Sequence, residues 1–250
     1  MSHTIMTIIG FLFVFVMTAL GAALVFCFKK GIPERLQTLF FGIAAGVMSA
    51  AAVWSLIIPA LEQSGFLTVG GGCLLGGVFM ICLDFLAPKI PKESGLSQRS
   101  TKLFFAVTLH NIPEGLAVGF AFGAAYAAGT TAAYALALGL AFGIGLQNLP
   151  EGAAVSLPIK NDLNSNKKAF LYGLCSGLAE PIFAVVGFLT SATLTIIQPF
   201  LLSLSAGAML FVVAEELLPA CENEKTRKLG AWGFLIGFVI MMSLDVALGG

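Results

Sequence analysis

The sequence predicts an all-α integral membrane protein with eight transmembrane helices and both termini outside. Of its 250 residues, 58% are apolar and only 10% are charged, and the mean hydropathy is +0.97. Soluble domains contain about 25% charged residues, so this composition indicates a membrane protein. The net charge is zero, which argues against a nucleic-acid partner. No separate soluble domain is evident, and residues 1–250 are predicted to form a single transmembrane domain.

Eight apolar runs are each long enough, at about 20 residues, to span a bilayer. They cover residues 5–28, 36–59, 67–87, 103–127, 130–158, 169–191, 197–219 and 229–248. The first run is longer than a signal-peptide core of about 7–15 residues, and no basic residue precedes it. We therefore expect it to be the first membrane helix, embedded together with the other seven in lipid.

All 13 basic residues fall at alternate connections between these runs. They are Lys29, Lys30 and Arg35; Lys89, Lys92, Arg99 and Lys102; Lys160, Lys167 and Lys168; and Lys225, Arg227 and Lys228. The positive-inside rule makes these connections cytoplasmic and both termini external, as in a multi-pass protein of the cell (inner or plasma) membrane. The longest polar connection, about residues 88–102, is predicted to be a flexible cytoplasmic loop. The 29 glycines scattered through the runs favour close helix packing, with hinges as the alternative.

A six-residue polar pattern occurs twice inside apolar runs. It reads His110-Asn111-Ile112-Pro113-Glu114-Gly115 in the fourth run and Gln147-Asn148-Leu149-Pro150-Glu151-Gly152 in the fifth. These runs are antiparallel neighbours joined by a very short outer turn. At a rise of 1.5 Å per residue, Glu114, Glu151 and Glu180 lie roughly 14–18 Å from the cytoplasmic ends of their helices. All three carboxylates are therefore expected near the centre of the bilayer.

Carboxylates at that depth need a compensating charge. One charged residue at a helix centre costs about 2.5–3.5 kcal/mol, and three at one depth repel each other, so a bound divalent cation would relieve both penalties. Side chains four residues apart share a helix face, which places His110 beside Glu114 and Gln147 beside Glu151. Imidazole, carboxylate and amide oxygen suit Zn²⁺, Fe²⁺, Mn²⁺ or Cd²⁺ better than Ca²⁺ or copper(I). A purely structural hydrogen-bond network is the alternative.

The prolines of the two motifs predict interruptions of their helices. Pro113 and Pro150 each lack a backbone donor and clash with the carbonyl four residues earlier. The carbonyls freed in this way, those of Leu109 and Leu146, would be available as ligands or for water. Interrupted helices near the membrane centre are typical of the ion sites of transporters.

Five further acidic residues lie nearer the two membrane surfaces. Glu62 and Asp245 fall at the outer ends of helices, whereas Asp84, Glu215 and Glu216 fall towards inner ends. Together they would mark an entrance and an exit. For each residue alone, a solvated helix end is the simpler interpretation, and His3 is assigned no role.

The doubled motif resembles that of the ZIP family of divalent-metal transporters. Glu180-Pro181, Glu215-Glu216 and the segment Met241–Gly249 resemble its bacterial GufA-like branch, and the resemblance covers nearly the whole chain. It implies a 3+2+3 inverted-repeat bundle, zinc transport towards the cytoplasm and a homodimer. It also implies that a bundle of helices one, four, five and six moves against a scaffold formed by the others.

The resemblance further implies a binuclear metal site. His110, Glu114, Gln147 and Glu151 would bind the first ion, Asn111, Asn148 and Glu180 would complete the second, and Glu114 and Glu151 would bridge. Met48 and Ser55 would line the outer approach, with Glu62 as a first contact. Three departures from the family pattern matter: Asn148 where relatives often have Asp, Gln147 where many have His, and a cytoplasmic loop without a histidine-rich stretch. Asn148 predicts a weaker second site and Gln147 predicts looser selectivity for zinc, and the loop gives no support for metal sensing there.

Two other functions are compatible with a helical membrane protein. A proton-coupled transporter of a small organic solute would use the same glutamates but would not need His110 beside Glu114. An intramembrane hydrolase fits poorly, because the chain lacks His-Glu-x-x-His and Gly-x-Ser-x-Gly and contains only two histidines. We therefore expect a transporter and not an enzyme.

Overall fold

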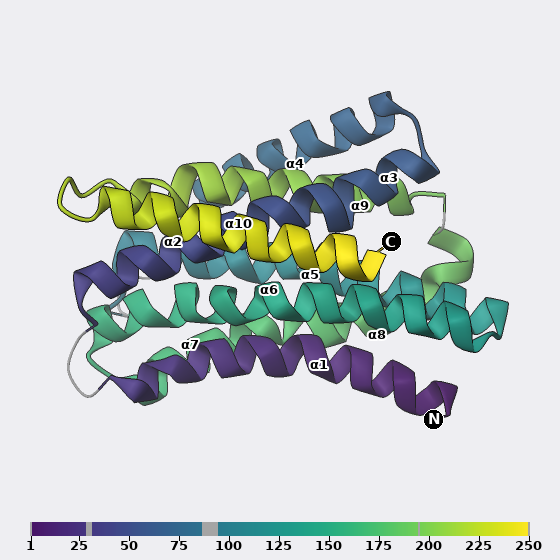
Figure 1. Cartoon of the computed structure of the whole chain (residues 1–250), viewed down its shortest axis with the longest axis horizontal. Helices are drawn as coiled ribbons and strands as arrows, with labels where there is room; N and C mark the ends of the chain where they lie inside the picture. The colour runs from purple at the N-terminus through teal and green to yellow at the C-terminus, as the bar shows by residue number, and fades with distance from the viewer. Residues whose placement is uncertain (1, 29–31, 87–94, 195, 250) are drawn as a thin grey trace.

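The computed structural model describes residues 2–28, 32–86, 95–194 and 196–249. Within these ranges the chain forms helices and short connections without a strand, and the helices run along one common axis (Figure 1). Seven helical segments of the described chain are long and apolar enough to cross a membrane, and Phe66–Cys82 is a shorter apolar helix. The predicted all-α membrane fold is therefore confirmed.

The helical segments follow the eight predicted runs in order. They are α1 (His3–Ala23) with the 3₁₀ turn η1 (Leu24–Cys27); α2 (Glu34–Ala51), the π-helix η2 (Ala52–Ile57) and α3 (Ile58–Gln63); α4 (Phe66–Leu86); α5 (Gln98–Ala128); α6 (Thr131–Leu163); α7 (Asn166–Gly177) and α8 (Ala179–Leu194); α9 (Gln198–Val212), the π-helix η5 (Val213–Leu217) and the 3₁₀ turn η6 (Pro219–Cys221); and α10 (Arg227–Gly249).

The interruptions predicted at the two motifs are absent. Helix α5 continues through Pro113 over 31 residues, and helix α6 continues through Pro150 and Pro158 over 33 residues. A proline removes only one backbone donor, and long helices held on several sides by neighbours tolerate that loss.

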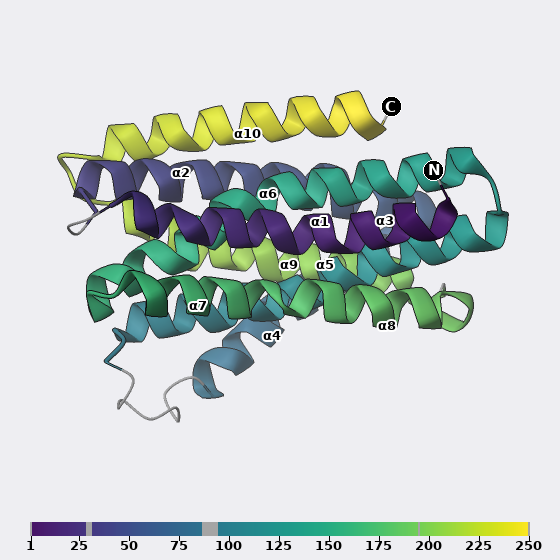
Figure 2. The same cartoon turned by 90° about the horizontal axis from the view of Figure 1, so that it is seen from below.

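The helices break instead in three other segments. Helices α7 and α8 lie end to end (Figures 1 and 2) but separate at Leu178, three residues before Pro181. The chain widens into the π-helix η2 just before Pro59 enters α3, and into η5 just before Pro219 begins η6. The wider turn accommodates the proline ring against the preceding carbonyls.

The connection between α5 and α6 is as short as predicted. Gly129 ends α5 in the left-handed conformation, with φ 67°, and its amide donates to the carbonyl of Ala125 at 3.0 Å. The hydroxyl of Thr130 then accepts from the amide of Ala133 at 3.2 Å and caps α6. Two residues therefore reverse the chain, and the motif helices become antiparallel neighbours.

Glycines allow close helix packing in the same pattern in the first three spans and in the last three. A Cβ at Gly46 of α2 would lie 2.0 Å from the carbonyl oxygen of Phe234 in α10. A Cβ at Gly207 of α9 would lie 2.0 Å from that of Cys73 in α4. The pair α2 and α10 (Figure 2) therefore packs as the pair α9 and α4 does, as expected for an inverted repeat. At these positions glycine serves packing.

The two ends of the bundle differ in charge. Both termini lie at one end in Figure 1, and the connections that contain the described basic residues lie at the other. Lys160 was expected to flank a loop but lies inside α6, because that helix extends to Leu163. The Lys160 side chain is buried, and its amine donates to the carbonyls of Val25 and Phe28 and to the Asn166 side chain. It therefore caps the end of η1.

Candidate metal centre

The seven predicted metal ligands lie within the helix bundle. Their side chains are 0–1% exposed, and six of them come from the middle of the continuous helices α5 and α6. They are His110, Asn111 and Glu114 of α5, Gln147, Asn148 and Glu151 of α6, and Glu180 of α8. Polar groups at such depth require partners, which they find mainly in each other.

The two motif copies pair with each other across the helix interface. Nε2 of His110 lies 3.3 Å from Oε2 of Glu151, so the first residue of one copy reaches the carboxylate of the other. In the reciprocal contact, Nε2 of Gln147 donates to Oε1 of Glu114 at 2.9 Å. The four side chains therefore surround one point between α5 and α6.

The imidazole of His110 is oriented as a metal ligand is. Its Nδ1 lies 3.1 Å from the carbonyl oxygen of Ala106, one turn earlier in α5. A carbonyl can only accept, so Nδ1 is the donor, and in the neutral ring Nε2 keeps its lone pair. That lone pair faces Glu151, and a backbone carbonyl behind the ring is a common outer partner of metal-binding histidines.

Three of the predicted ligands converge closely enough to hold one ion. One donor atom each from His110, Glu114 and Glu151 lies within 4.8 Å of the other two. Several buried oxygens around this point have no hydrogen-bond partner in the described structure. They are Oδ1 of Asn111, Oε2 of Glu114, Oε1 of Gln147, Oδ1 of Asn148 and Oε1 of Glu151. Unpartnered oxygens are costly in an apolar interior, and a divalent cation would satisfy them.

Glu180 differs from the other two carboxylates. Its Oε2 accepts from Nδ2 of Asn148 at 2.6 Å, and its Oε1 accepts from the hydroxyl of Thr18 at 3.0 Å. Nδ2 of Asn111 donates to the carbonyl of Ser176 at 3.0 Å. Sequence reasoning did not identify Thr18, although a hydroxyl within the long apolar run of helix one was a usable signal.

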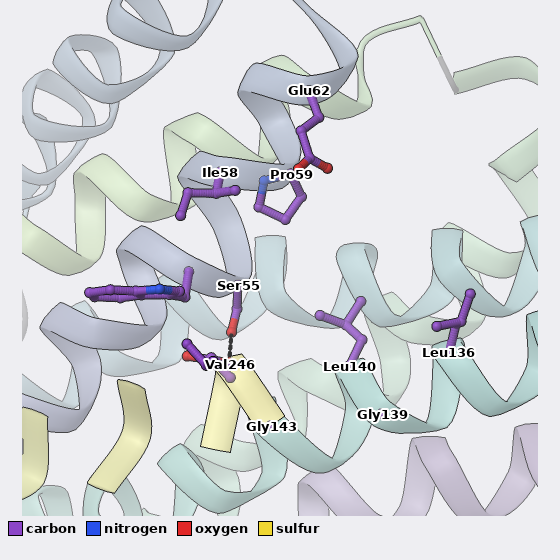
Figure 3. A pocket seen from close by; sticks show the side chains of 11 residues that line it. Ser55, Ile58, Pro59, Glu62, Leu136, Gly139, Leu140, Gly143 and Val246 are labelled. Carbon is purple, nitrogen blue, oxygen red and sulfur yellow. Dashed lines mark hydrogen bonds between the residues drawn. The ribbon is translucent and has the colours of Figure 1, made fainter. Parts of the chain in front are cut away.

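A pocket of about 390 Å³ is lined by residues of η2, α3, α6 and α10 (Figure 3), towards the end of the bundle that carries both termini (Figure 1). The pocket is bordered by Glu62, and deeper in it the Ser55 hydroxyl donates to Oδ1 of Asp245 at 2.7 Å. Gly143 also lines the pocket and lies four residues, or one helical turn, before Gln147 on α6. The pocket therefore ends about one turn from the converging ligands.

The remaining predicted pathway residues lie elsewhere. Met48 is buried in the main hydrophobic core and does not line the pocket. Glu215 is exposed and Glu216 is half-buried in η5, towards the opposite end of the bundle. The side chain of Asp84 lies outside the described residues.

Comparison with known proteins gives a consistent result. Residues 91–245 match the family described as ZIP Zinc transporter. The chain is 32% identical to Zinc transporter ZIP11 of Homo sapiens, with 99% of this chain and 98% of that protein covered. It is 33% identical to Zinc transporter ZIPB of Bordetella bronchiseptica, covering 94% and 79% of the two chains. It is 32% identical to Zinc transporter GufA of Myxococcus xanthus, covering 93% and 94%. These names describe transporters and not enzymes.

Proposed function

Because this chain belongs to the ZIP family of zinc transporters, we propose that it carries divalent metal ions, chiefly Zn²⁺, across the membrane towards the cytoplasm. The observation that supports this function best is the buried trio of His110, Glu114 and Glu151, whose donor atoms lie within 4.8 Å of one another. One imidazole and two carboxylates match the ligands that Zn²⁺ takes in proteins. The amide oxygen of Gln147 completes the first ion site.

The same ligands also suit other borderline divalent ions. Cd²⁺, Fe²⁺ and Mn²⁺ accept nitrogen and oxygen donors, and the mixed set around His110 has no thiolate to exclude them. We propose these ions as secondary substrates. We further propose a second, weaker position between Asn111, Asn148 and Glu180, with Glu114 and Glu151 bridging. The unpartnered amide oxygen of Asn111 supports that position.

The proposed route begins in the outer pocket. Glu62 at its border would attract a cation, and Asp245 and Ser55 would pass it towards Gly143 and the central ligands (Figure 3). Oδ2 of Asp245 has no hydrogen-bond partner in the described structure, so this carboxylate can accept a passing cation. Met48 is proposed to contact the ion as the route opens, and Asp84, Glu215 and Glu216 are proposed at the exit.

Release on the far side requires motion between two groups of helices. Helix α1 packs mainly on α6 and α5 mainly on α8, whereas α2 packs on α10 and α4 on α9. The first group contains the metal ligands, and we propose that it moves against the second. In the outer half the first group has a hydrophobic cluster of its own, which includes Val14, Phe122 and Ile144, and the pocket lies between the groups.

At the inner end the two groups are joined by polar contacts. The Asn161 amide of α6 donates to the Gln37 side chain of α2 at 3.2 Å, and Arg99 of α5 donates to the carbonyl of Glu216 at 3.4 Å. Beside these contacts lies an inner pocket of about 240 Å³, lined in part by Gln37, Arg99 and Asn161, so each end of the bundle has a pocket. Transport would open these inner contacts as the outer pocket closes.

The test of transport is metal uptake into proteoliposomes loaded with a fluorescent zinc indicator. The parent protein is expected to give saturable uptake of Zn²⁺, with competition by Cd²⁺, Fe²⁺ and Mn²⁺. Glu114→Ala removes a central ligand and should reduce uptake to the level of empty liposomes. Equal uptake by Glu114→Ala and the parent would refute the proposed site.

Transport of an organic solute by proton coupling is not favoured. Such a transporter would have no reason to bring His110 within reach of two buried glutamates. Finally, we propose that the protein is a homodimer in the cell membrane, as the family resemblance implies. Native mass spectrometry in detergent distinguishes a dimer from a monomer.

A further inference from the structure

Each motif helix has a second helix packed against the glycine that ends its motif. A Cβ at Gly115 of α5 would lie 2.4 Å from the carbonyl oxygen of Glu180 in α8. A Cβ at Gly152 of α6 would lie 2.1 Å from the carbonyl oxygen of Thr18 in α1. The backbone of Thr18 therefore packs on the second copy as the backbone of Glu180 packs on the first. Thr18 is the counterpart of Glu180 in the inverted repeat.

The side chains of these two counterparts meet. The Thr18 hydroxyl donates to Oε1 of Glu180 at 3.0 Å, and both residues are buried. The same hydroxyl lies 3.3 Å from the carbonyl of Val14, one turn earlier in α1. A hydroxyl has one proton, and the carboxylate oxygen of Glu180 is the nearer of the two acceptors. The main partner of Thr18 is therefore the carboxylate.

Packing alone does not explain the hydroxyl. The Thr18 methyl group lies against α7, because a Cβ at Gly177 would lie 2.8 Å from Cγ2 of Thr18. Valine would fill that space equally well without placing a polar atom in an apolar helix. The hydroxyl adds its contacts with the Glu180 carboxylate and with the carbonyl of Val14, and only the first of these reaches the metal centre.

Asn148 completes the arrangement from α6. Its Nδ2 donates to Oε2 of Glu180 at 2.6 Å and lies 3.3 Å from the carbonyl of Val14. Two donors, one from a hydroxyl and one from an amide, therefore engage both carboxylate oxygens of Glu180, the atoms that a second cation would need as ligands. To present its oxygen to that cation, Asn148 would have to turn its amide and give up both bonds.

We infer that Thr18 is a positioning residue of the metal centre. Together with Asn148 it fixes Glu180 by hydrogen bonds in place of a second ion, so that one ion binds tightly at His110, Glu114 and Glu151 and a second binds weakly. This inference, which rests on the proposed function, assigns Thr18 a role in setting how many ions the site holds. It acts through Glu180 and does not contact the first ion.

The test is titration of purified full-length protein in detergent with Cd²⁺ alone, followed by isothermal calorimetry and by elemental analysis of bound metal. The parent is expected to bind one Cd²⁺ tightly and a second at least tenfold more weakly. Thr18→Val removes a donor from Glu180 at almost constant volume, so the second Cd²⁺ should bind at least tenfold tighter while the first is unchanged. Thr18→Ser keeps the hydroxyl and should match the parent.

Two further variants connect the effect to Glu180. Asn148→Asp replaces the other donor with a carboxylate and should also strengthen the second Cd²⁺. In a Glu180→Gln background, Thr18→Val should have no effect on it. If Thr18→Val does not yield folded protein, Thr18→Ala is measured instead and the same gain is expected.

The outcomes separate this inference from the proposed function. If the parent binds two Cd²⁺ ions equally tightly, the inference is overturned and metal binding is left intact. The same holds if the hydroxyl-free variant binds the second Cd²⁺ with an affinity within twofold of the parent's. Failure of the parent to bind any Cd²⁺ more tightly than Glu114→Gln would overturn the proposed metal site itself.

Discussion

Helices α5 and α6 place the same motif at the same depth, yet they offer a metal ion different atoms. Both copies provide a glutamate, and each copy reaches across to the other, through His110 to Glu151 and through Gln147 to Glu114. The α5 copy contributes an imidazole nitrogen where the α6 copy contributes an amide. The repeat therefore fixes the geometry of the site, while single residues decide which half binds the ion more strongly.

The neighbouring helices extend the same asymmetry. Helix α8 packs on the α5 copy and carries a carboxylate, that of Glu180, whereas α1 packs on the α6 copy and carries the hydroxyl of Thr18. The Glu180 carboxylate itself reaches across to Asn148 of the α6 copy. An imidazole and an additional carboxylate thus come from α5 and α8, and two neutral groups come from α6 and α1. A transporter has to release its ion, so one strong half and one weak half are a reasonable compromise between capture and release.

Substitution of the glutamates that both copies of the motif share should have the largest effect on zinc uptake. Glu114→Gln and Glu151→Gln keep the shape and remove the charge that neutralises a divalent ion. Loss of an outer partner of a metal ligand costs about 10–100-fold, so loss of a ligand should reduce zinc uptake by at least about 100-fold in each variant. Glu224→Gln, at an exposed position, is the control. Different losses in the two variants would show that the copies share the ion unequally.

His110→Gln makes the two copies alike and should give the next largest effect. Zinc binds imidazole nitrogen more strongly than manganese does, so zinc affinity should fall by about 10–100-fold and manganese affinity by less. Competitive uptake of Zn²⁺ against Mn²⁺ measures the change. An unaltered preference for zinc would mean that selectivity arises elsewhere along the route.

Gln147→His makes the copies alike in the opposite sense. A second imidazole should raise the affinity for zinc by about tenfold and slow the release of the ion. Calorimetry in detergent measures the first change, and maximal uptake rate in proteoliposomes measures the second. Weaker zinc binding in this variant would contradict the view that the α6 copy of the motif binds the ion more weakly than the α5 copy does.

Packing at the motif glycines should be equally sensitive in both halves. Gly115→Ala and Gly152→Ala each place a Cβ against a carbonyl oxygen of the adjacent helix, at 2.4 and 2.1 Å. Such overpacking typically costs about 1–3 kcal/mol, so both variants should lower the thermal stability of the detergent-solubilised protein. Gly71→Ala in α4 is the control, because a Cβ there would meet nothing within 4 Å. A loss in one half only would show that the two interfaces are not equivalent.

Much of this organisation could be predicted from the sequence because it depends on composition and periodicity. The helix order, the clustering of basic residues at one end and the burial of the doubled motif follow from hydropathy, charge and spacing. The continuity of α5 and α6 through Pro113 and Pro150 did not follow, because neighbouring helices compensate for a missing hydrogen bond. The contact between Thr18 and Glu180 also required the structure, because it joins helices distant in the sequence.

A substitution in the outer pocket should have the smallest effect on zinc uptake, because the ion passes through the pocket before it reaches the asymmetric metal centre. Ser55→Ala removes the hydrogen bond to Asp245, and water in the open pocket can replace it at little cost. The KM for zinc uptake should therefore rise by only about two- to threefold, with an unchanged maximal rate. Ser49→Ala is the matched control, because in the described structure the Ser49 hydroxyl donates to the carbonyl of Ala45 within α2. A fall in the maximal rate would show that Ser55 takes part in the conformational step of transport. The outer pocket would then have to be compared together with the two halves of the metal centre.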